Sequence, residues 1–92
     1  MTRLSDSDLS VALKSLDGWS AAGGEIRKTF AFKNFVESIA FVNRLADVAE
    51  KAQHHPDIDI RFNKVRIGLT THDEGGISDK DTALAAQIDS LA

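Results

Sequence analysis

The chain has 92 residues, a length that predicts one compact domain over residues 1–92 and excludes a multidomain enzyme. Its 11 basic and 14 acidic residues give a net charge of −3, which disfavours nucleic acid and anionic membranes as partners. The absence of cysteine excludes disulfides, thiolate chemistry and cysteine-based metal sites. No apolar run is long enough to span a membrane and no signal-peptide core is present, so we expect a cytoplasmic protein.

The first predicted element is a helix that begins after Ser5. Ser5 and Asp8 have the spacing of a capping box, and the apolar residues that follow recur at helical spacing as far as Leu16. Gly18 stands where a C-terminal helix cap is expected. The sequence therefore predicts a short amphipathic helix that ends at about residue 18.

A β-hairpin is predicted next. Segments 19–22 and 25–32 flank Gly23-Gly24, a dipeptide typical of two-residue hairpin turns. In the second segment, apolar residues alternate with polar ones apart from Lys28, which falls on the apolar face.

A long helix is predicted from about residue 35 to residue 51. Asn34 and Glu37 form a second capping-box pattern at its start. Its apolar residues cover an arc of about 180°, which is wider than one sheet contact requires. Either the helix is wedged between the sheet and the other helices, or part of the arc forms a subunit interface. These apolar residues are Phe35, Ile39, Phe41, Val42, Leu45, Ala46, Val48 and Ala49.

A second hairpin and a last helix complete the predicted fold. Apolar residues alternate at 58–62 and at 65–69, and Asn63-Lys64 is expected to form the turn between them. Ser78 and Asp81 form a third capping-box pattern before the last helix. The order α-β-β-α-β-β-α predicts a two-layer α+β fold, with a four-stranded antiparallel sheet and three helices on one face.

The three histidines lie close together in this predicted fold. His54 and His55 follow the long helix and precede Pro56, which fixes the chain direction. A hairpin centred between residues 63 and 64 places residue 72 opposite residue 55. We therefore expect His54, His55 and His72 around one mouth, and imidazole is the side chain that changes charge near neutral pH.

Two chemistries fit this histidine cluster. Glu50 lies four residues before His54 on the same helical face, so three imidazoles and a carboxylate could hold zinc. Against a metal, the side chains of His54 and His55 diverge by about 100° at a helix end, and HxH and HxxxH spacings are absent. The alternative is metal-free general acid–base catalysis by separate imidazoles. Taken alone, each histidine and Glu50 could also be a solvated surface residue.

Other motif classes are absent. The sequence contains no glycine-rich phosphate loop and no nucleophile-elbow serine. Five basic residues form at most a small patch around the second hairpin turn, which we interpret as a solvated edge that discourages sheet pairing rather than as a nucleic-acid site. They are Lys28, Lys33, Arg61, Lys64 and Arg66.

The order and spacing of these residues closely resemble the signature of the pterin-4a-carbinolamine dehydratases. The similarity extends upstream through Gly18-Trp19 and the Phe30-x-Phe32-x-x-Phe35 pattern, and so covers nearly the whole chain. The motifs that carry the similarity are Glu50-x-x-x-His54-His55-Pro56, Phe62-Asn63-Lys64-Val65, Thr71-His72 and Gly76-Ile77-Ser78-x-x-Asp81.

This resemblance implies a lyase, a 4a-hydroxytetrahydrobiopterin dehydratase that converts 4a-hydroxytetrahydropterin to quinonoid dihydropterin and water. It implies that neither a metal nor an organic cofactor is needed. It places the enzyme in tetrahydropterin recycling, downstream of aromatic amino-acid hydroxylases. It also implies a homodimer or homotetramer, which would account for the wide apolar arc of the long helix.

The resemblance also implies roles for individual residues. His54 would protonate the departing 4a-hydroxyl, His72 would share the acid–base duty, and His55 would bind and orient the pterin. Glu50, Pro56 and Asp81 would bind substrate or support the site, although Asp81 could simply cap the last helix. The vertebrate pattern often has an aromatic residue after the proline, where this chain has Asp57-Ile58.

A second hypothesis comes from a different class of protein. Some members of the family also act as dimerisation cofactors of a transcription factor, so the resemblance leaves open a non-catalytic binding role. The complete histidine set favours catalysis, because a pure interaction module does not need it.

Overall fold

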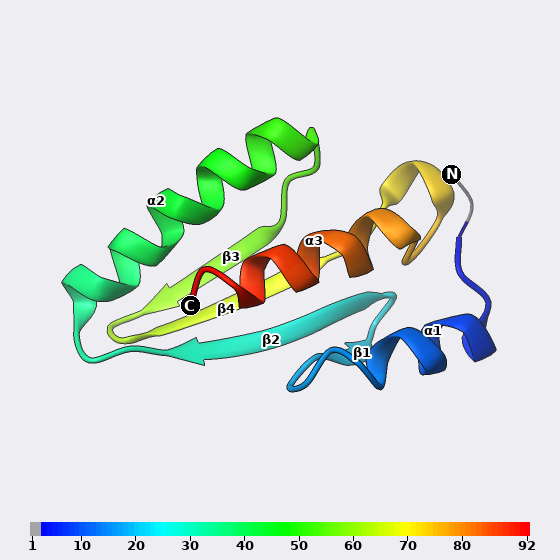
Figure 1. The fold of residues 1–92 in the computed structure, drawn as a ribbon, viewed down its shortest axis with the longest axis horizontal. Coiled ribbons are helices and arrows are strands. Elements are labelled where there is room, and N and C mark those ends of the chain that lie inside the picture. Colours follow the sequence, from blue (N-terminus) through cyan, green and yellow to red (C-terminus); the bar gives the residue numbers. More distant parts are fainter. Residues whose placement is uncertain (1–2) are drawn as a thin grey trace.

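The computed structural model describes residues 3–92, which form three α-helices over one face of a four-stranded antiparallel sheet (Figure 1). This confirms the predicted α+β architecture; residues 1 and 2 of the expected domain lie outside the described residues. The strand order is β1-β2-β4-β3. The elements are α1 (Asp6–Leu13), β1 (Ser20–Ala22), β2 (Glu25–Ala31), α2 (Phe35–Ala52), β3 (Asp57–Arg61), β4 (Lys64–Leu69), the short 3₁₀ helix η1 (His72–Glu74) and α3 (Asp79–Asp89).

The hydrophobic core lies between the sheet and the helices. Phe41 of α2 is fully buried, and its ring lies 5.0 Å from that of Phe30 and 4.9 Å from that of Phe32. Burying a phenylalanine side chain stabilises a fold by about 1.5–3 kcal/mol, so this aromatic cluster fixes α2 on the sheet. The other fully buried apolar residues are Ile26, Leu45, Val65, Ile67, Leu69, Ala85 and Ile88.

The first helix is shorter than predicted. Ser5 caps it as expected, because its Oγ accepts a hydrogen bond from the Asp8 amide at 3.1 Å. The helix ends at Leu13, however, and the amides of residues 14–16 bond to carbonyls three residues back, which tightens the chain into a turn. Gly18, with φ +85°, therefore belongs to the connection before β1 rather than to the helix cap.

The glycine hairpin forms as predicted. Gly23 and Gly24 have φ values of +61° and +80°, and Ala22 pairs with Glu25 on either side of them. Positive φ at both central positions is the geometry that matches the twist of the flanking strands. The second strand ends at Ala31, one residue before its predicted end.

The long helix α2 begins where the sequence predicts. Asn34 Oδ1 accepts a hydrogen bond from the Glu37 amide at 2.9 Å. The helix ends at Ala52, and Gln53 adopts a left-handed conformation with φ +55°. Part of its apolar arc faces the core, but Phe35 remains 50% exposed. Both interpretations of the arc are therefore compatible with the fold.

The second hairpin turns one residue earlier than predicted. Arg61 pairs with Lys64, so the turn is Phe62-Asn63 rather than Asn63-Lys64, and Phe62 leaves the strand with φ +55°. Two hydrogen bonds fix this turn: Asn63 Nδ2 donates to the Phe32 carbonyl at 3.0 Å, and the Phe32 amide donates to the Asn63 carbonyl at 2.8 Å. Phe62 is consequently 67% exposed instead of facing the core.

No helix within residues 3–92 has the length and apolar character needed to cross a membrane.

Candidate active site

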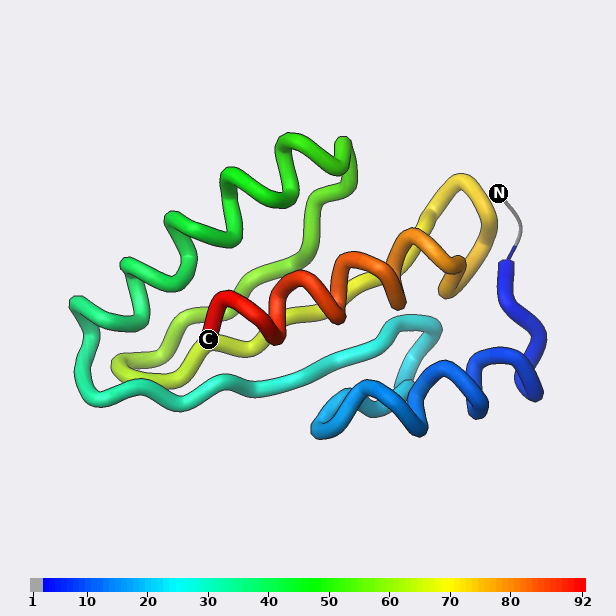
Figure 2. Tube along the Cα trace, in the orientation of Figure 1, coloured from blue at the N-terminus to red at the C-terminus, as the bar shows by residue number. Residues whose placement is uncertain are grey.

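All three histidines line one depression of about 250 Å³. His54 and His55 lie in the connection between α2 and β3, and His72 begins η1 just after β4. Figure 2 shows that the end of α2 and the start of η1 lie at the same end of the β3–β4 hairpin, away from its turn. The full lining is Gln53, His54, His55, Thr70, Thr71, His72, Asp73 and Lys80.

The histidines converge although the predicted register was wrong. The observed pairing of Ile58 with Ile67 centres the hairpin at 62.5, so residue 72 would be opposite residue 53 rather than residue 55 if the ladder continued. The ladder in fact stops at Asp57 and Gly68. Because both chain ends leave the sheet at the same end, a shift of one residue does not separate them.

His54 is held by a buried carboxylate. Its Nε2 contacts Oδ1 of Asp81, and the two side chains are 12% and 0% exposed. The second oxygen of Asp81, Oδ2, accepts hydrogen bonds from the Ser78 amide at 2.9 Å and from Thr71 Oγ1 at 2.8 Å. Both oxygens of this carboxylate thus have hydrogen-bond partners, as a buried polar group requires.

The direction of the hydrogen bonds in this network follows from counting hydrogens. Thr71 has one hydroxyl hydrogen, and it points to Asp81. Ser78 Oγ, 2.7 Å from Thr71 Oγ1, must therefore donate to Thr71. Ser78 Oγ in turn accepts from the Lys80 amide at 3.3 Å. A chain of aligned donors thus runs from the first turn of α3 to the carboxylate that contacts His54.

The other two histidines are more exposed than His54. His55 Nε2 lies 2.9 Å from Glu50 Oε1, and these side chains are 61% and 72% exposed. An exposed pair of this kind contributes little stability but can restrict the orientation of the ring. His72 is also exposed and lines the same depression. The cluster therefore combines one fixed imidazole with two accessible ones.

The predicted site residues fall into three groups. His54, His55 and His72 line the depression, whereas Glu50 and Asp81 each contact one of these histidines from outside it. Pro56 does neither: it stands between His55 and β3.

Asp81 caps the last helix and also contacts a histidine of the cluster. It completes the capping box of α3 through Oδ2 and contacts His54 through Oδ1.

Five residues that line the depression are not among the predicted site residues: Gln53, Thr70, Thr71, Asp73 and Lys80. Thr70, Thr71 and Asp73 flank the predicted His72 in the sequence, as Gln53 flanks His54, and this proximity is the signal that could identify them. Lys80 gave no signal, because the sequence does not show that the start of α3 lies beside the end of α2. Among the described residues, no group of three or more His, Cys, Asp or Glu side chains is placed to hold a metal ion.

Comparison with known proteins identifies the family. The model of the family described as pterin 4 alpha carbinolamine dehydratase matches residues 2–91. A relative from Thermomicrobium roseum is 49% identical over 92 residues, covering 100% of this chain and 99% of its own. One from Roseiflexus sp. is 54% identical over 90 residues, covering 98% and 97%. Both relatives carry the pterin-4-alpha-carbinolamine dehydratase name.

The chain belongs to the pterin-4a-carbinolamine dehydratase family. Members of this family are hydro-lyases, and the chain is a dehydratase of this class. The resemblance described from the sequence motifs is therefore confirmed.

Two solved structures are similar to this chain. The crystal structure of a transcriptional coactivator/pterin dehydratase from Brucella melitensis superposes with a TM-score of 0.95 at 34% identity, covering 99% of each chain. A pterin dehydratase-like protein described as a RuBisCO assembly factor in the alpha-carboxysome gives a TM-score of 0.66 at 29% identity, covering 80% of this chain and 86% of its own.

Proposed function

We propose that this dehydratase acts on 4a-hydroxytetrahydropterin by histidine general acid–base catalysis and serves tetrahydropterin recycling. The observation that carries the proposal is the placement of His54: its ring lines the three-histidine depression and is held from behind by the buried Asp81. A solvated surface histidine needs no such support.

The reaction requires one proton to be donated to the substrate and one proton to be removed from it. The C4a–O bond breaks with its electron pair on oxygen, and the lone pair of the adjacent ring nitrogen forms the C=N bond. The oxygen takes a proton and leaves as water, and the nitrogen loses its proton to a base. Two imidazoles in different protonation states supply both transfers without a stronger electrophile.

His54 is the proposed acid for the departing hydroxyl. A carboxylate accepts hydrogen bonds, so His54 uses its Nε2–H toward Asp81, and Nδ1 is left to exchange the proton with substrate. This division resembles other sites in which a buried carboxylate fixes the orientation and tautomer of a catalytic imidazole.

His72 and His55 have complementary proposed roles. His72, which lines the same depression from the start of η1, shares the acid–base duty at the ring nitrogen. His55, oriented by Glu50, binds the pterin. Pro56 supports the site by directing the chain from the histidines into β3.

A purely non-catalytic role as a dimerisation or transcription cofactor would not require the buried partner of His54. We therefore favour catalysis over that alternative.

The test is turnover of synthetic 4a-hydroxytetrahydropterin by the native protein and by the His54→Ala variant. We expect the variant to lose about 10²- to 10⁴-fold in rate, the usual contribution of a positioned acid–base group. Lys33→Ala, which changes an exposed residue that does not line the depression, is the control and should keep the native rate. Equal rates for the native protein and His54→Ala would remove the proposal.

A further inference from the structure

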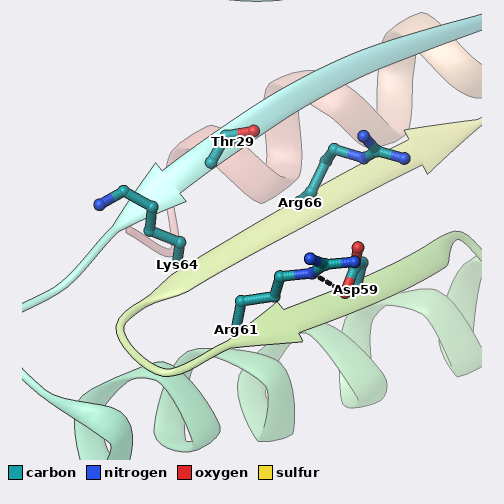
Figure 3. Close-up of a pocket in the computed structure, with 5 residues that line it drawn as sticks. All are labelled: Thr29, Asp59, Arg61, Lys64 and Arg66. Atoms are coloured by element: carbon teal, nitrogen blue, oxygen red, sulfur yellow. Dashed lines mark hydrogen bonds and ion pairs between the residues drawn. The ribbon is translucent and has the colours of Figure 1, made fainter.

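The sheet face turned away from the helices carries charged residues that the proposed catalysis does not use. They surround a depression of about 350 Å³ across β2, β4 and β3. Figure 3 shows their side chains standing on this open face, with α3 behind the sheet. The lining residues are Thr29, Asp59, Arg61, Lys64 and Arg66, and we call this surface the open-face depression.

Positive charge is in excess in the open-face depression. Asp59 Oδ1 lies 3.4 Å from Arg61 Nε, so one of the three cations has an acidic partner. Within the described residues, neither Lys64 nor Arg66 forms an ion pair, although Asp59 is directly opposite Arg66 in the β3–β4 ladder. This local excess contrasts with the net charge of −3 of the whole chain.

The strand order contradicts the interpretation of Lys64 and Arg66 as residues that protect a sheet edge. Lys64 and Arg66 lie on β4, which is a central strand between β2 and β3. Lys28, also assigned to the patch from the sequence, lies on the opposite face and donates to Asp89 at 2.9 Å. Edge protection can therefore apply only to Arg61, on the edge strand β3.

The arrangement of two of these cations also lowers the stability of the sheet when no partner is bound. Arg61 and Lys64 are directly opposite each other in the β3–β4 ladder, and like charges in that position are destabilising. Asp59 compensates part of this charge, because it contacts Arg61 and is opposite Arg66 in the ladder, whereas the ladder partners of Lys64 are Ala31 and Arg61. A local pairing rule that is broken in this way occurs most often at a functional site. An anionic partner would relieve the repulsion.

We propose that the open-face depression docks an acidic segment of a partner protein. Lys64 and Arg66 are two residues apart on one face of a strand, a separation of about 7 Å. Carboxylates at alternate positions of a strand, or four residues apart on a helix, match that separation. Thr29, paired with Arg66 in the sheet, adds a neutral hydrogen-bonding group beside the cations.

Other anions fit the surface less well. A nucleic-acid backbone presents a continuous run of phosphates, whereas only three cations line the open-face depression. A single phosphate ion would find no enclosed site, because the Arg61 side chain is 83% exposed. An acidic protein segment can spread its carboxylates over the exposed cations.

The probe for this proposal is a fluorescein-labelled dodecapeptide of alternating glutamate and threonine, titrated by fluorescence anisotropy at low salt. We expect saturable binding that weakens as salt rises, since exposed charges are screened. The double variant Lys64→Gln/Arg66→Gln should bind at least tenfold more weakly. The control Lys33→Gln/Lys51→Gln removes the same charge from residues outside the depression, and its affinity should change less than twofold.

Three results would overturn the proposal. The native protein could fail to bind the peptide, both double variants could lose affinity equally, or a single-stranded oligothymidylate could bind more tightly than the peptide. The Lys64→Gln/Arg66→Gln variant should unfold near the native temperature, because both side chains are exposed and the loss of the Arg61–Lys64 repulsion offsets the loss of the Asp59–Arg66 attraction. Its dehydratase rate should equal the native rate, so this test is independent of the proposed catalysis.

Discussion

At the residue scale, Asp81 links the start of a helix to the histidine cluster. The spacing of Ser78 and Asp81 predicts a helix cap, and the structure contains it. The same spacing says nothing of His54, which is 27 residues away in the chain. Local sequence therefore predicts one bond of this carboxylate, and only the packing of α3 beside the end of α2 reveals the other.

Thr71 should stabilise the fold through this carboxylate. Thr71→Val removes the hydroxyl that donates to Asp81 and leaves the Ser78 hydroxyl without its acceptor. Losing a buried hydrogen-bond partner costs about 1–3 kcal/mol, so we expect a decrease of this size in the free energy of unfolding. Denaturant unfolding measures it, with Thr71→Ser as the variant that keeps the hydroxyl. Equal stability of the Val and Ser variants would show that the network carries no energy.

At the element scale, turns with a distinctive sequence could be predicted and the others could not. Gly23-Gly24 identifies the first turn from sequence, because glycine readily adopts the positive φ that both positions have in the structure. The second turn contains no glycine, and Phe62 adopts a conformation that bulky residues rarely use. What fixes it is the pair of bonds between Asn63 and Phe32, which lie 31 residues apart. Such a contact cannot be predicted from local propensity.

The backbone requirement at the first turn can be tested by Gly24→Ala. A Cβ at this position would meet no atom within 4 Å, so the substitution isolates the cost of φ +80° for a residue with a side chain. We expect a loss of about 1 kcal/mol in the free energy of unfolding, measured by denaturant titration. Gly24→Asn should lose less, because asparagine tolerates this conformation. A Gly24→Ala variant as stable as the native chain would contradict the turn geometry.

At the scale of the whole molecule, hydrophobic periodicity alone predicts the two layers and the helices on one face of the sheet. The convergence of the histidines follows from topology. An error of one residue in the predicted register does not affect it, because the two lining segments that carry the histidines leave the same end of one hairpin. The contribution of α3 to the site could not be predicted, since no periodic pattern specifies how helices from the two halves of the chain pack together.

Exposed apolar residues at the start of α2 predict self-association. Phe35 and Val36 are 50% and 75% exposed. A thin core gains stability when such residues are covered by a second subunit. We therefore expect a homodimer or homotetramer by light scattering, and Val36→Glu should shift the mass toward that of one chain. A native mass equal to the single-chain 10.0 kDa would contradict this.

The most direct test of the proposed catalysis combines His54 and Asp81 in a double-mutant cycle. Dehydratase rates would be measured for the native protein, His54→Ala, Asp81→Asn and the double variant. If Asp81 acts through His54, the double variant should be no slower than His54→Ala, because the two residues form one unit. If the rate losses of the two single variants multiply in the double variant, the proposal that Asp81 acts through His54 is contradicted. A His54→Ala variant with the native rate would contradict the proposal that His54 transfers the proton.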